Sequence, residues 1–176
     1  MEDLRNSLSG RRSGLDLLLS KIPGYGGYRD KELRREADQK LRLYLADQFS
    51  QQLRRAEEVS QQMLTGPGLS QLAEMGQANT RLQTLIDRVK TASQGYTGFF
   101  DAVKIGDEEL DRLYEFDENM LHTVDDIAAA LEALQAALDA GETDKLAPVV
   151  RRYARAISDA ATTFDRRKEI LAGLGY

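Results

Sequence analysis

Apolar residues recur along most of the chain at intervals of three and four residues, which is the spacing of amphipathic helices. No segment shows the strict alternation that is typical of a β-strand. The pattern predicts a short helix and four longer ones, over residues 2–20, 30–64, 70–92, 107–140 and 144–172. Because short links join the longer helices, each is expected to pack antiparallel on the one before it. We therefore expect an all-α fold, an elongated up-down four-helix bundle with a short N-terminal helix.

Breaks in the pattern define the expected organisation. Pro23 and Pro67 stand beside glycines, whereas Pro148 falls in the expected first turn of a helix, where proline is tolerated. Asp30 and Asp107 are suited to cap the helices that follow them. We expect an amphipathic helix over 1–22 and a bundle domain over 23–176.

A glycine–aromatic motif occurs twice, as "GYGGY" from Gly24 and as "GYTGF" from Gly95, and "GY" closes the sequence. Each motif precedes a similar helix start, "DKELRR" or "DEELDR". Duplication of a helical hairpin would explain the similarity, and so would coincidence between two glycine-rich helix entrances.

The up-down topology predicts that the aromatic residues of these loops gather at one end of the bundle. Two interpretations stay open: an apolar plug that closes the bundle, or a surface that binds a protein partner, since exposed tyrosines are good contact residues. The residues concerned are Tyr25, Tyr28, Tyr96, Phe99, Phe100 and Tyr176.

Asp117 falls near the middle of the apolar face of its helix. A buried carboxylate needs a partner, and Arg34, Arg35 and Asp38 enter the neighbouring helix from the same end. We expect an Arg–Asp pairing between these helices, with a tyrosine or Arg88 as a further member, that fixes their register. A catalytic or metal-binding role, or an exposed Asp117, are the alternatives.

Charge and composition limit the function. The 176 residues carry a net charge of −5 and no cysteine, and residues 101–145 hold 14 acidic against 3 basic residues. The acidic segment lies between mildly basic ones, which favours pairing between helices of the chain over a nucleic-acid surface. Without cysteine or a long apolar stretch, the chain is expected to be soluble and cytoplasmic.

Catalytic and metal-binding motifs are missing from the sequence. His122 is the only histidine, and it is expected on an outward face with Asp111, Glu115, Glu118 and Asp126, whereas a ferritin-like centre needs two inward Glu-x-x-His pairs. There is no phosphate-binding loop, zinc-protease motif or nucleophile elbow. We expect no cofactor, no resident metal and no enzymatic activity.

The sequence also resembles known proteins in two respects. A short amphipathic helix before a long hairpin is similar in layout to phage-shock and ESCRT-III-like membrane-remodelling proteins. The stretches "IPGYGGYRDKELRREAD", "GYTGFFDAVKI" and "ELDRLYEFD" resemble a family of uncharacterised bacterial helical proteins. That second resemblance implies a bacterial origin and a helical fold, with no known activity.

The leading hypothesis is a non-enzymatic scaffold that binds a protein partner, or a second copy of itself, through the aromatic loops. The alternative is a peripheral membrane protein that uses the N-terminal helix, and a third is a metal-binding bundle.

Overall fold

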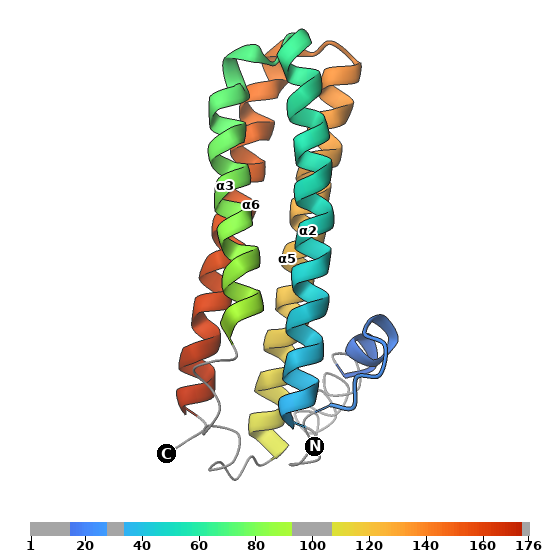
Figure 1. Cartoon of the computed structure of the whole chain (residues 1–176), viewed down its shortest axis with the longest axis vertical. Coiled ribbons are helices and arrows are strands. Elements are labelled where there is room, and N and C mark those ends of the chain that lie inside the picture. Colours follow the sequence, from blue (N-terminus) through green and yellow to red (C-terminus); the bar gives the residue numbers. More distant parts are fainter. Residues whose placement is uncertain (1–14, 28–33, 93–106, 174–176) are drawn as a thin grey trace, which may run out of the picture. The chain divides into compact units, whose positions relative to one another are not determined.

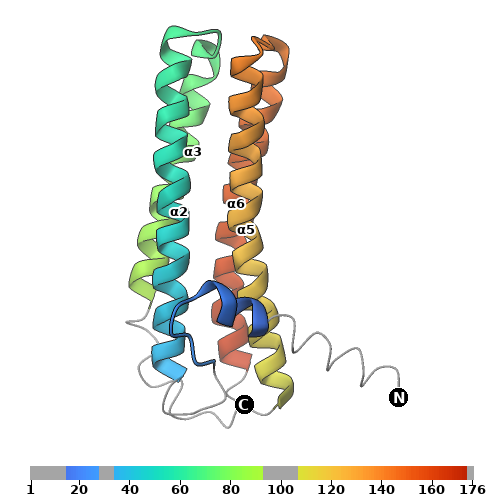
Figure 2. The same cartoon turned by 90° about the vertical axis from the view of Figure 1, so that its right-hand side faces the viewer.

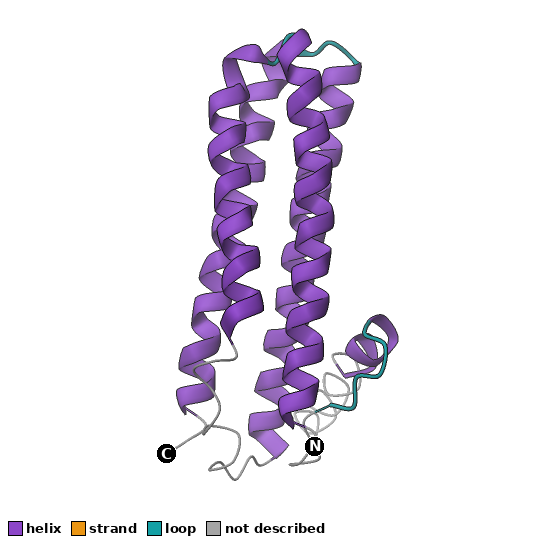
Figure 3. Cartoon of the chain, viewed as in Figure 1, coloured by secondary structure: helices purple, strands orange, loops and turns teal. Residues whose placement is uncertain are grey.

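The structure is a computed structural model, and it describes residues 15–27, 34–92 and 107–173. Within these ranges all regular secondary structure is helical, which confirms the predicted all-α class for this part of the chain (Figure 3). Residues 15–21 form a short helix. The other helices are α2 (Arg34–Thr65), the 3-10 helix η1 (Leu69–Gln71), α3 (Leu72–Thr91), α5 (Asp107–Asp139) and α6 (Thr143–Gly173) (Figure 1).

The helices correspond closely to those predicted from the apolar spacing, with small differences at their starts. The helix expected over 70–92 begins as η1 and continues as α3. The first helix is seen only over residues 15–21 of the expected 2–20, since residues 1–14 lie outside the described ranges. The predicted cap Asp30 also lies outside them.

Pro148 lies one turn deeper in its helix than the sequence predicts. Because α6 begins at Thr143, directly after the turn, Pro148 falls in the second helical turn. A proline there cannot donate to the carbonyl of Asp144, four residues earlier. Asp144 is exposed, so water can satisfy that carbonyl.

The turn before α6 depends on Gly141, which has a φ of +67°. The Gly141 amide donates to the Leu138 carbonyl at 3.1 Å, and the Glu142 amide donates to the Ala137 carbonyl at 2.9 Å. This pair of hydrogen bonds is the Schellman arrangement that ends a helix at a left-handed glycine. It reverses the chain within a few residues and lets α6 begin at once.

The chain divides into two compact units, each built from segments of all four long helices. Unit 1 comprises Met1–Leu45, Val89–Leu121 and Thr163–Tyr176, and unit 2 comprises Ala46–Arg88 and His122–Thr162. Both have an apolar interior: Leu18, Leu41 and Leu113 are fully buried in unit 1, as are Phe49 and Leu82 in unit 2.

Within unit 2, side-chain contacts show which helices are neighbours. Gln135 of α5 donates to Gln62 of α2 at 2.8 Å, and Tyr153 of α6 donates to Asn79 of α3 at 3.0 Å. Short turns join α2 to α3 and α5 to α6. In this unit α2 therefore lies beside α5, and α3 beside α6, as two views agree (Figures 1 and 2).

Candidate functional site

A buried cluster of four charged side chains occupies the interior of unit 1. Arg167 of α6 donates to Asp38 of α2 at 2.5 Å and lies 3.5 Å from Asp117 of α5. Arg42, one turn after Asp38, donates to the other oxygen of that carboxylate at 2.8 Å. All four side chains are at most 5% exposed. The cluster joins two carboxylates to two guanidinium groups, so its formal charge is zero.

Arg42 extends the cluster to a fourth helix. Its Nη1 lies 3.4 Å from the backbone carbonyls of Val89 and Lys90, in the last turn of α3. Carbonyls at a helix C-terminus lack partners within the helix and carry partial negative charge, so a cation is favourable there. The cluster thus ties together segments of α2, α3, α5 and α6 inside unit 1.

Sequence reasoning identified the acids of this cluster but not its arginines. Asp38 and Asp117 come together around Arg167, whereas the side chains of Arg34 and Arg35 lie outside the described residues. A signal for Arg167 was present, because it continues the three- and four-residue spacing of the buried Ala160 and Phe164. To predict a buried ion pair from sequence, both the acidic and the basic residues that fall on apolar helix faces have to be considered.

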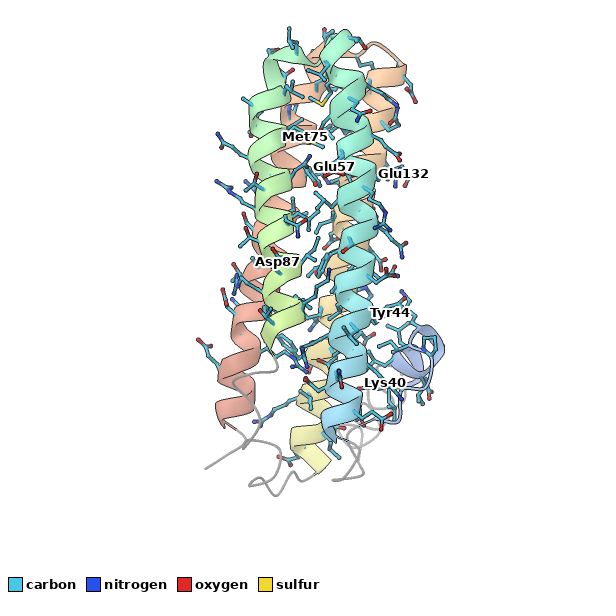
Figure 4. All side chains as sticks on the ribbon, viewed as in Figure 1. Lys40, Tyr44, Glu57, Met75, Asp87 and Glu132 are labelled. Carbon is cyan, nitrogen blue, oxygen red and sulfur yellow. The ribbon has the colours of Figure 1, made fainter. Side chains whose placement is uncertain are left out.

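Residues 24–27 of the first glycine–aromatic motif pack against other parts of unit 1. Gly24 and Gly27 have φ values of +70° and +73°, in the left-handed region that glycine enters easily. Between them, Tyr25 is turned inward and only 4% exposed. Lys40 of α2 donates to the Gly24 carbonyl at 2.6 Å and pairs with Glu36, so the segment is held beside α2 (Figure 4).

Gly27 is required for a close approach. A Cβ atom at this position would lie 2.7 Å from the hydroxyl of Tyr114 on α5, well inside contact distance. Residues 15–27 therefore pack on both α2 and α5 within unit 1. With so little of its surface exposed, Tyr25 acts here as a packing residue and offers little to a partner.

The other aromatic residues proposed for partner binding lie outside the described residues, namely Tyr28, Tyr96, Phe99, Phe100 and Tyr176. The segments that carry them all belong to unit 1. In sequence these segments adjoin four helix ends, namely the start of α2, the end of α3, the start of α5 and the end of α6. The buried cluster ties those parts of the four helices together in unit 1.

The short helix at residues 15–21 turns its apolar side toward protein. Leu18 and Ile22, two of the leucine and isoleucine residues that a membrane-binding face would use, are at most 2% exposed, whereas Leu19 is 48% exposed. None of the described helices combines the length and the apolar character needed to cross a bilayer.

A separate hydrogen-bond chain lies in unit 2. Tyr153 donates to Asn79 at 3.0 Å, Asn79 donates to Ser60 at 3.3 Å, and Ser60 donates to the carbonyl of Ala56 at 2.8 Å. Burial raises the pKa of the Tyr153 hydroxyl, and the negative charge of Glu57 raises it further. The phenol therefore stays protonated and acts as a donor that links α6 to α3 and, through Asn79, to α2.

The histidine considered for metal binding is exposed on α5. His122 Nδ1 lies 3.8 Å from a carboxylate oxygen of Asp125, and both side chains are more than half exposed. Among the described residues, no group of three or more His, Asp or Glu side chains is arranged to hold a metal ion.

Comparisons of the chain with protein-family models, with curated proteins and with solved structures give no match. The resemblance to bacterial helical proteins thus stays an expectation, and a functional proposal has to rest on the chain itself.

Proposed function

We propose that this protein is a non-enzymatic cytoplasmic scaffold, a four-helix bundle that binds a protein partner through its glycine–aromatic loops. The observation that carries the proposal is the buried cluster of Asp38, Arg42, Asp117 and Arg167. It fixes segments of four helices in one unit, and every loop that carries the aromatic residues starts or ends on those helices. Fixed helix ends that carry several aromatic segments suit a binding surface, because less conformational freedom at its base has to be lost on binding.

The structure of the first loop refines which residues should make contact. Since Tyr25 is packed inside unit 1, its contribution is to hold the base of the loops in place. Contact with a partner is assigned to Tyr28, Tyr96, Phe99, Phe100 and Tyr176. Tyrosine and phenylalanine are enriched in the central contacts of protein interfaces.

A pull-down from an extract of the source cells tests the proposal. The loop variant Tyr28→Ala/Tyr96→Ala/Phe99→Ala should lose the proteins that the wild type captures, while its thermal unfolding stays close to that of the wild type. The control variant, Leu64→Ser/Leu69→Ser, removes two exposed leucines from unit 2 and should retain them. If the loop variant and the wild type capture the same proteins, the loops are not the binding surface.

A further inference from the structure

Two surfaces of unit 2 carry opposite charges. The first lies where α3 and α6 are neighbours. A cavity of about 190 Å³ opens there, lined by Arg81, Thr84 and Arg88 from α3 and by Ile157 and Ser158 from α6. Of the two arginines that line it, Arg81 is the exposed one and supplies positive charge beside the cavity.

Two more arginines extend this surface along α6. Arg151 and Arg155 precede Ser158 by seven and three residues, which places them on the same side of the helix. Arg81, Arg151 and Arg155 are all exposed, and no described acidic side chain lies within ion-pair distance of them. We call these three residues the arginine face.

The second surface is a row of acids on α5. Asp125, Glu132 and Asp139 are spaced by seven residues and are exposed, so they follow one side of the helix. Gln135, within this row, donates both to Asp139 and to Gln62 of α2, each at 2.8 Å. The row therefore runs along the side of α5 next to α2, where Glu132 is seen in Figure 4. We call these three acids the acidic face.

The two faces lie on different helix pairs of unit 2. The acidic face lies on α5, beside α2, and the arginine face lies on α3 and α6, which form the other side of the unit (Figure 1). Between residues 122 and 139, α5 contains no lysine or arginine, and its histidine, His122, lies 3.8 Å from Asp125. Because the two faces lie on opposite sides of the unit, the arginines of one copy cannot form ion pairs with the acids of the same copy.

We propose that copies of this chain associate with one another, the arginine face of one copy docking on the acidic face of the next. A carboxylate from the acidic face enters the cavity beside Arg81. The contact joins two different surfaces, so each added copy still presents one free face of each kind, and the assembly grows without closing. Because exposed ion pairs are individually weak and are screened by salt, the association should require high protein concentration and low ionic strength.

Sedimentation velocity of the full chain over a range of concentrations tests this proposal. At an ionic strength of roughly 0.03 M the wild type should form a growing series of oligomers, and at roughly 0.5 M, where the screening length falls below ~5 Å, it should be monomeric. The variants Arg81→Glu/Arg155→Glu and Asp125→Lys/Glu132→Lys should each associate at least about tenfold more weakly than the wild type.

Mixing the two variants gives the sharpest result. In the first variant both faces are acidic, and in the second both are basic, so each should stay monomeric alone while an equimolar mixture regains assembly. The control Arg54→Glu/Arg152→Glu makes the same change in charge on exposed residues outside the arginine face, and it should associate far more strongly than Arg81→Glu/Arg155→Glu. A wild type that remains monomeric at low ionic strength overturns the proposal, as does a mixture that fails to regain assembly.

The inference does not depend on the glycine–aromatic loops. The loop variant Tyr28→Ala/Tyr96→Ala/Phe99→Ala should assemble like the wild type, so failure of one proposal can be told apart from failure of the other.

Discussion

Removing Arg167 should be the most damaging single change in unit 1. Arg167→Met keeps much of the aliphatic volume but leaves two carboxylates without this cation; Asp117 is fully buried and Asp38 is 5% exposed. Asp38 still has Arg42, so most of the cost should come from Asp117. Breaking a buried ion pair by removing one partner costs about 3–5 kcal/mol. For a chain of this size that corresponds to a fall in melting temperature of roughly 10 °C.

Urea unfolding followed by circular dichroism measures the change in the free energy of unfolding. The neighbouring residue supplies the control, because Arg166 is exposed and Arg166→Met should change stability by no more than about 0.5 kcal/mol. In the Arg167→Met background, Asp117→Leu should restore part of the loss, with a coupling of about 1 kcal/mol or more. A loss below about 1 kcal/mol for Arg167→Met would refute the view that the cluster is buried and mutually paired.

Three further predictions concern backbone conformation and the hydrogen-bond chain of unit 2. Gly27→Ala should destabilise the protein by about 1–3 kcal/mol, because its φ is +73° and the new Cβ would lie 2.7 Å from the Tyr114 hydroxyl. Gly76→Ala should stabilise it by about 0.5–1 kcal/mol, since an added Cβ on α3 meets nothing within 4 Å; urea unfolding that gives both glycine variants the same sign would contradict this reasoning. Tyr153→Phe should cost about 1 kcal/mol at pH 8, because Asn79 loses its donor. Since burial raises the pKa of Tyr153, the stability that comes from its protonated state is fully present below about pH 10 and is lost as the pH rises further. The difference in the free energy of unfolding between Tyr153→Phe and the wild type should therefore become smaller at about pH 10.5. A difference that does not change with pH would show that the Tyr153 hydroxyl titrates normally.

Periodicity alone was enough to predict the helices, because helix-forming segments with a regular apolar face leave little choice of secondary structure. The helix expected over 30–64 is α2, Arg34–Thr65, and that expected over 107–140 is α5, Asp107–Asp139. The position of Pro148 was predicted less well. Pro148 is the sixth residue of α6, and even the expected start at residue 144 would make it the fifth, beyond a first turn of about 3.6 residues. The Schellman turn at Gly141 sets the observed start.

The partners inside the candidate site could not be predicted in the same way. The helical period places Asp117 among apolar residues, but it does not say which arginine from another helix will reach it. Arg167 lies near the end of α6, and the packing of α6 against α2 and α5 in unit 1 brings it to Asp38 and Asp117. The direction of the Tyr25 side chain could not be predicted either, because a tyrosine between glycines can turn inward or outward. Two left-handed glycines and the Lys40 contact turn it inward.

The contact between Asp38 and Arg167 also has a consequence for folding, because it joins residues 129 positions apart in the sequence. During synthesis Asp38 and Asp117 are made well before Arg167, and until α6 is complete neither acid has this cation. Closing so long a loop is entropically costly, and such distant contacts are characteristic of slow folding steps. The two carboxylates should therefore remain hydrated in the growing chain, and unit 1 should complete its interior only when the end of α6 docks.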